Sequence, residues 1–261
     1  PVVHYDGRTI LFSYRKGGTA PFHLYEIQSD GTRLRQLTSG IYDDIEPYWL
    51  PDDSIIFVSG RARRYVNCWV TQVATLYRCD RDGQNIRQIS ANVEQDNTPC
   101  VLPDGRVVFQ RWEYVDRSQV HFHHLWTVNP DGTSQMTYYG NLHGGLAMLD
   151  AKPIPGTRKV VASFSPGHGR PERRGYVTVV DPGAGPDMPN TTKRISKGNR
   201  SYRDPYAISE DCFLAANREG IFVMDGQGNT ELVYKLSKSD GRMECHEPRP
   251  LVSRPRERAI P

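Results

Sequence analysis

Short apolar runs recur along the whole chain, and each follows directly on a tight-turn signal. The turn at residues 51–53 leads into the run 55–57, and the turn at 103–105 leads into 107–109. The runs are rich in β-branched and aromatic residues, which favour β-strands. Equivalent positions in five such runs are Phe12, Phe57, Phe109, Val161 and Leu214, which lie 45, 52, 52 and 53 residues apart. The spacing predicts five successive sheet-forming repeats.

A second turn signal recurs inside the repeats. Asp-Gly pairs separate apolar alternating segments in four of them, at Asp30, Asp82, Asp131 and Asp225. An Asp-Gly pair between two such segments is a strong hairpin signal. In the fourth repeat a longer loop, 181–189, stands at this place. Each repeat is therefore predicted to form about four antiparallel strands.

A single sheet of this kind cannot bury both of its faces, so the repeats must stack side by side. We expect an all-β fold, a β-propeller with about five four-stranded blades that form part of a six- or seven-bladed ring. No segment has helical periodicity, so little or no helix is expected. The predicted propeller spans 1–248, and 249–261 is predicted to be a Pro/Arg-rich linker to a missing C-terminal domain. The predicted blades are approximately 1–46, 47–98, 99–152, 153–204 and 205–248.

Composition adds few constraints. The 23 glycines and 19 prolines among 261 residues suit frequent turns, and the net charge of +3 indicates no nucleic-acid partner. No apolar run is long enough to span a membrane. The five cysteines form no Cys-x-x-Cys pair, and their odd count gives no disulfide framework. Cys68 and Cys79 could pair across a hairpin, but no disulfide is predicted.

The repeat resembles a known type of propeller repeat. Residues 24–38 and 47–57 carry the pattern of TolB-like, or PD40-type, repeats, which occur in proteins of unrelated function. A narrower resemblance covers most of the chain: four segments look like the propeller region of proteins related to the hydrazine synthase alpha subunit. These segments are 63–69, 111–117, 164–170 and 245–250.

That resemblance implies a six-bladed propeller followed by a middle domain and a cytochrome c-like domain, in an extracytoplasmic, periplasm-like compartment. In the synthase, c-type haems in the later domains condense ammonia with hydroxylamine derived from nitric oxide. This chain contains no Cys-x-x-Cys-His motif; its nearest match ends in Cys245-His246 but has Arg242 at the first cysteine position. No haem is therefore expected to be attached covalently here, and any haem belongs to the missing domains.

The repeats also supply a candidate site. A loop that ends in proline precedes each of the five repeat boundaries, and equivalent loops should surround one mouth of the propeller channel. Their oxygen, sulfur and nitrogen donors can bind Zn²⁺ or Ca²⁺, with Cys245, His246 and Asp96 as the predicted metal set. The alternative is that the aspartates cap turns by accepting backbone N–H groups. The candidate ligands at the channel mouth are Asp44, Glu46, Asp96, Asp150, Asp204, Cys245, His246 and Glu247.

Two weaker candidates lie elsewhere. On a strand, His121 and His123 would share one face and could share a metal, although a polar strand face is the more common reason for this spacing. His168 and Arg170 lie in a glycine-rich turn that a ligand can approach closely.

Three functions remain open from the sequence. The first is a propeller scaffold or binding domain of a larger haem-associated redox protein, which contributes a metal or substrate ligand at the channel mouth. The second is a TolB-like interaction module that receives a protein partner at a propeller face. The third is a self-contained propeller hydrolase or lyase. No catalytic motif decides among them.

Overall fold

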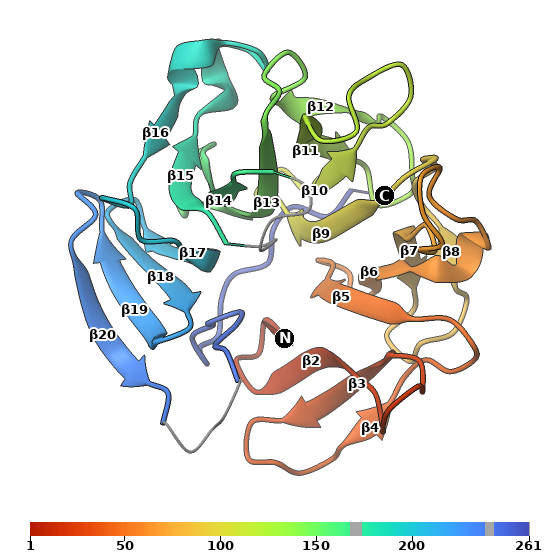
Figure 1. Cartoon of the computed structure of the whole chain (residues 1–261). Helices are drawn as coiled ribbons and strands as arrows, with labels where there is room; N and C mark the ends of the chain where they lie inside the picture. Colours follow the sequence, from red (N-terminus) through yellow and green to blue (C-terminus); the bar gives the residue numbers. More distant parts are fainter. Residues whose placement is uncertain (168–173, 238–242, 261) are drawn as a thin grey trace. The chain divides into compact units, whose positions relative to one another are not determined.

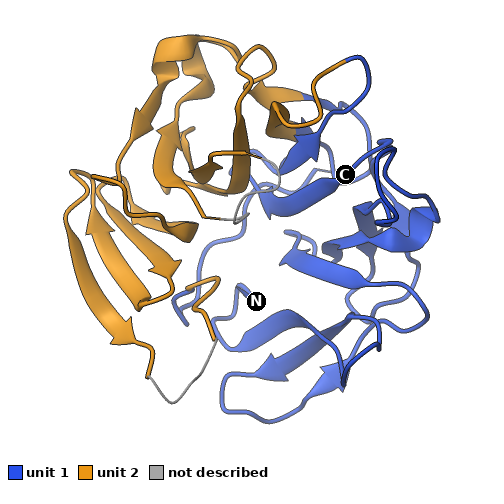
Figure 2. Ribbon diagram, viewed as in Figure 1, with its two compact units in different colours: residues 1–116, 127–136, 249–261 blue, residues 117–126, 137–248 orange. Residues whose placement is uncertain are grey.

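The structure is a computed structural model that describes residues 1–167, 174–237 and 243–260. The chain divides into two compact units (Figure 2). Unit 1 comprises residues 1–116, 127–136 and 249–261, and unit 2 comprises residues 117–126 and 137–248. Among the described residues no helix is long and apolar enough to cross a membrane.

Unit 1 contains two complete four-stranded sheets, each of which we call a blade, with strands in chain order (Figure 1). The first blade consists of β1 (Val2–Val3), β2 (Thr9–Tyr14), β3 (His23–Gln28) and β4 (Arg35–Gln36). The second consists of β5 (Asp44–Trp49), β6 (Ile55–Ser59), β7 (Thr75–Cys79) and β8 (Arg87–Gln88). All of these pairings are antiparallel.

Unit 2 contains two further sets of four strands in chain order. The fourth blade consists of β13 (Leu146–Pro153), β14 (Val160–Ser165), β15 (Tyr176–Val180) and β16 (Thr192–Arg194). The fifth consists of β17 (Arg203–Ser209), β18 (Cys212–Asn217), β19 (Gly220–Asp225) and β20 (Thr230–Lys235).

The third repeat is divided between the units. β9 (Asp96–Val101) pairs antiparallel with β10 (Val107–Trp112) inside unit 1. The residues of β11 (Phe122–Val128) and β12 (Met136–Tyr139) fall partly in each unit. Within unit 2, β11 pairs in parallel with β13, where Phe122 lies opposite Leu146.

The predicted all-β fold with four-stranded antiparallel sheets is confirmed. In the described residues the helical structure consists of short 3₁₀ turns: η1 (Gly60–Ala62), η2 (Pro182–Ala184) and η3 (Pro189–Thr191). The last two occupy the long loop predicted in the fourth repeat. The size of the propeller ring stays a prediction.

Burial explains the apolar runs that follow each turn. Every residue of β6, β10 and β14, the second strands of their blades, is buried. A strand covered on both faces reads as a continuous apolar run, because neither face alternates with solvent. The turn signals precede these strands because they join the first and second strands of each blade.

The first strands of the blades share a bulge. The pairing register shifts at this point in β5, β9, β13 and β17, and a residue with left-handed backbone lies inside each shift. A fifth residue of this kind lies in the segment that follows the fifth blade. The five residues are Glu46 (φ 51°), Thr98 (φ 53°), Asp150 (φ 54°), Asp204 (φ 51°) and Glu247 (φ 49°).

The hairpin glycines serve a second purpose. A Cβ on Gly83 would lie 2.1 Å from the backbone oxygen of Leu37, and one on Gly132 would lie 2.7 Å from that of Ile89. Each contact joins the last turn of one repeat to the end of the preceding repeat. These glycines therefore supply both a positive φ and a close approach between backbones.

Residues 249–260 form no strand, yet they contact unit 1 at three successive turns. The Arg254 N–H donates to Tyr5 O, and the Arg258 N–H donates to Pro103 O. Arg256 donates to Pro51 O and lies 2.7 Å from the Asp53 carboxylate. The segment predicted as a linker is thus extended and packed against the first three repeats.

The glycine contacts give a testable difference between two similar turns. Gly83 and Gly31 have nearly the same backbone, at φ 84° and 83°, but nothing lies within 4 Å of a Cβ on Gly31. We expect Gly31→Ala to cost about 1 kcal/mol through the left-handed backbone alone. Gly83→Ala should cost about 2 kcal/mol more, because the methyl group also collides with Leu37 O. Urea unfolding of both variants measures the difference, and equal losses would contradict the contact between repeats.

Candidate functional site

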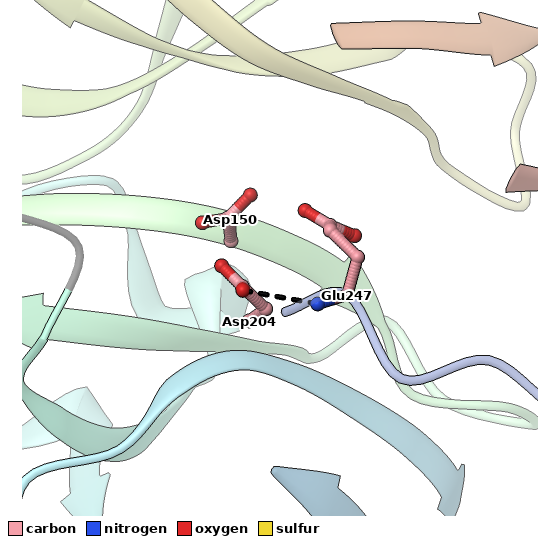
Figure 3. Close-up of side chains that lie close together, drawn as sticks. All are labelled: Asp150, Asp204 and Glu247. Atoms are coloured by element: carbon pink, nitrogen blue, oxygen red, sulfur yellow. Dashed lines mark hydrogen bonds between the residues drawn. The ribbon is translucent and has the colours of Figure 1, made fainter. Parts of the chain in front are cut away.

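The bulged first strands bring carboxylates together in unit 2. Asp150 comes from β13, Asp204 from β17, and Glu247 from the segment after the fifth blade (Figure 3). One carboxylate oxygen from each lies within 4.8 Å of the other two. Asp150 and Asp204 are buried, and Glu247 is partly exposed. We call these three residues the acidic cluster.

Hydrogen bonds hold the cluster in place. The Glu247 backbone N–H donates to Asp204 Oδ2 over 3.0 Å, and the His246 ring Nδ1 lies 3.1 Å from the same oxygen. An oxygen of the Asp150 carboxyl group lies within 4.8 Å of one of the Asp204 carboxyl group. The ammonium group of Lys152 is 3.7 Å from Asp150 Oδ1, with both side chains about 95% buried.

The two aspartates differ strongly in acidity. Burial and the charges of Asp204 and Glu247 raise the pKa of Asp150 well above its usual range. Burial also opposes ionisation of Asp204, but hydrogen bonds from His246, Asp150 and the Glu247 N–H outweigh it and lower the pKa of Asp204. The two directions favour the protonated form of Asp150 and the ionised form of Asp204.

An arginine orients the imidazole beside the cluster. Arg203 NH1 lies 2.8 Å from His246 Nε2, and it also donates to Glu244. Because a guanidinium has no acceptor, Nε2 accepts this hydrogen bond and Nδ1 carries the proton directed at Asp204. Both ring nitrogens of His246 are thus engaged. Lys152, Arg203 and Glu244 were missed from the sequence, although each lies within two residues of a predicted ligand.

Asp44 and Asp96 do not belong to the acidic cluster. Each begins the first strand of its blade and is fully buried in an ion pair: Asp44 with Arg61, and Asp96 with Arg111, both at 2.8 Å. Their other donors are serine and asparagine side chains rather than backbone N–H groups. They are therefore buried partners of arginine, which neither the metal nor the turn-cap hypothesis predicted.

The sequence pattern aligned Asp150 with Asp44 and Asp96, but the backbone conformation aligns it with other residues. Asp150 shares its left-handed backbone with Glu46 and Thr98, two residues further along the strand. In the fourth blade Ala151 occupies the place that proline has in the others, so the Asp-x-x-Pro match at Pro153 is out of register. Glu46 lies in unit 1, where its Oε2 accepts the Thr98 N–H over 2.6 Å.

The weaker candidate site residues do not come together in the described part of the structure. β11 begins at Phe122, so His121 precedes the strand and is exposed, whereas His123 is buried in it. The expected shared strand face is therefore not formed. His168 and Arg170 lie outside the described residues. Among the described cysteines no disulfide is present; Cys68 is exposed and Cys79 is buried.

The acidic cluster offers oxygen donors only, which suit Ca²⁺ or Mg²⁺ rather than Zn²⁺. Of the predicted metal set, Asp96 belongs to unit 1, whereas Cys245 and His246 belong to unit 2. Cys245 is buried, and the His246 nitrogens already have partners. The residues present in unit 2 thus fit a hard cation better than a thiolate-bound one.

Comparison with solved structures shows a β-propeller domain. The whole chain superimposes on 41% of the chain of hydrazine synthase from Kuenenia stuttgartiensis, with a TM-score of 0.83 and 21% identity. A gluconolactonase from Xanthomonas campestris matches 84% of this chain and 70% of its own, with a TM-score of 0.52 and 15% identity. TolB from Acinetobacter baumannii matches 85% of this chain and 62% of its own, at a TM-score of 0.40 and 15% identity.

No family model matches the chain, and no curated protein matches its sequence. The resemblance to the hydrazine synthase chain is therefore one of fold, and it covers the whole length of this chain. The chain spans about two-fifths of the length of that synthase chain.

The opposite pKa shifts of Asp204 and Asp150 predict opposite effects of two isosteric substitutions in metal-free buffer. Asp204→Asn removes the ionised acceptor of the cluster and should cost about 3 kcal/mol of stability at neutral pH. Asp150→Asn should be neutral or stabilising there, because its amide can donate to Asp204 as the protonated acid does.

The pH dependence of the free energy of unfolding further distinguishes Asp204 from Asp150. The lowered pKa of Asp204 contributes stability above about pH 4, which is lost as the pH falls below that value. The raised pKa of Asp150 has the opposite sign: its contribution is complete below about pH 4 and is lost as the pH rises. Unfolding measured from pH 3 to 8 tests this, and a loss for Asp150→Asn as large as for Asp204→Asn would contradict the opposite protonation of the two carboxyl groups.

Proposed function

We propose that this chain is the scaffold and binding propeller of a larger, extracytoplasmic, haem-associated redox protein, and that its acidic cluster binds a divalent cation. The observation that carries the first part is the superposition of the whole chain on the hydrazine synthase chain, at a TM-score of 0.83. The gluconolactonase propeller reaches only 0.52 over 84% of the chain. The domain organisation of the synthase is therefore the best guide to that of this protein.

The role of this chain in such a protein is not haem attachment. Its sequence has no Cys-x-x-Cys-His motif. His246, the last residue of the nearest partial match, uses one ring nitrogen toward Arg203 and the other toward Asp204. We therefore assign the haems of the proposed protein to its other domains, as the resemblance to the synthase implies.

The cation proposal rests on the donor set of the acidic cluster. Three carboxyl groups from three separate chain segments approach within 4.8 Å, and burial beside Asp204 and Glu247 raises the pKa of Asp150, which favours its protonated form. A divalent cation would take the place of that proton and be held by Asp150, Asp204 and Glu247. An interaction module of the TolB type does not require such a site.

Calcium binding provides the test. Glu247→Gln removes one ligand charge and leaves the backbone N–H that anchors Asp204. We expect it to weaken Ca²⁺ binding at least tenfold in calorimetric titrations of the chain. Glu46→Gln is the matched control, because Glu46 has the same backbone conformation in unit 1; it should leave the affinity unchanged.

Two outcomes would contradict this assignment. Equal Ca²⁺ affinity in the wild type and Glu247→Gln would exclude the acidic cluster as the site. Stoichiometric zinc that is lost in the Cys245→Ala, His246→Ala double variant would assign the metal to those residues instead. The scaffold role is tested separately, since turnover of hydroxylamine and ammonia by this chain alone would contradict it.

A further inference from the structure

A second polar hollow lies in unit 2, apart from the residues of the acidic cluster. It has a volume of about 480 Å³ and is formed by the end of β16, the loop after it and the turn between β19 and β20. Lys193, Arg194 and Lys197 line it together with the backbone of Gly226. No aspartate or glutamate is among its lining residues. We call it the basic hollow.

The three cations have neutral partners. Lys197 Nζ donates to the Asn229 side-chain oxygen over 2.8 Å, and Lys193 Nζ lies 3.4 Å from Gly226 O. Arg194 donates through Nε to Ser196 O over 2.9 Å. An ammonium group has three donors, so each lysine retains donors beyond the one that these contacts use.

The hollow is also held in shape. The guanidinium of Arg194 stacks on the Tyr176 ring at 3.4 Å, which fixes its plane. A Cβ on Gly228 would lie 2.1 Å from Ile195 O, so the β19–β20 turn packs directly against the backbone after β16. The wall that carries the three cations is thus joined by backbone contact to the turn that forms the other wall.

The nearest carboxylate of the turn is directed toward its own backbone. Asp225 accepts hydrogen bonds from the Gln227 and Asn229 N–H groups and from the Asn229 side chain. It therefore closes the turn, and the charge of Lys197 is one of the minor causes that lower the pKa of Asp225. Three cations on the hollow thus face one carboxylate of the turn, whose hydrogen bonds are made within the turn itself.

We propose that the basic hollow binds a tetrahedral oxyanion, such as inorganic phosphate or the phosphate group of a monoester. Such an anion has several acceptor oxygens, and it can accept charge-assisted hydrogen bonds from Lys193 and Lys197 at once. The fixed guanidinium of Arg194 adds charge without further ordering cost. This site is independent of the cation proposed for the acidic cluster.

The test is a titration of the ¹⁵N-labelled chain with inorganic phosphate, followed by NMR. Amide signals of Gly198, Gly226 and Gln227 should shift and saturate with phosphate, but not with sodium chloride at equal ionic strength. The Lys193→Met, Lys197→Met double variant should weaken binding at least tenfold. The Lys16→Met, Lys235→Met variant removes the same charge elsewhere and should bind as the wild type does.

Three results would overturn the proposal. The first is equal affinity in the two double variants, which would assign the effect to net charge. The second is the same shifts with chloride, which would indicate ionic strength alone. The third is saturable binding with shifts confined to residues outside the hollow. Titration of a phosphate monoester then shows whether the hollow accepts a substituted phosphate or the free ion only.

Discussion

Close backbone contact between successive repeats is the constraint on which the rest of this structure depends. Gly83 and Gly132 approach the end of the preceding repeat so closely that no side chain fits. Glu46 and Asp204 accept the backbone N–H of the left-handed residue in the next repeat or segment, Thr98 and Glu247. Both kinds of contact need residues that hold a positive φ, and both fix the spacing at which buried second strands pack.

The same bulge that joins repeats also creates the site. A left-handed residue in a first strand turns its side chain out of the regular alternation, so it is available to contact the next repeat. In unit 1 the residues at this position are Glu46 and Thr98, and they satisfy each other. In unit 2 all three are acids, and burial together with the neighbouring charges raises the pKa of Asp150. The contact between successive repeats is thereby also a candidate ligand site.

Buried charge is treated differently in the two units. Asp44 and Asp96 are neutralised by arginines of their own blades, which leaves nothing for a ligand. In unit 2, Arg203 is directed instead to Glu244 and His246, and Lys152 is the cation nearest Asp150. The position of the arginine, rather than the presence of aspartate, separates a structural pair from a site that can exchange a proton or bind a cation.

The sequence by itself determined the local structure of this protein: where strands begin, where hairpins turn, and that the fold is all-β. Turn geometry and strand burial depend on neighbouring residues, so the signals at 51–53 and at Asp30 could be interpreted without the fold. Only the tertiary structure decided which acids meet. The Asp-x-x-Pro pattern wrongly aligned Asp150 with Asp44 and Asp96. The β-bulge that shifts the strand register is not visible in the residue pattern. The partners Lys152 and Arg203, and the packing of 249–260 on unit 1, depend on contacts between distant segments, which local spacing does not encode.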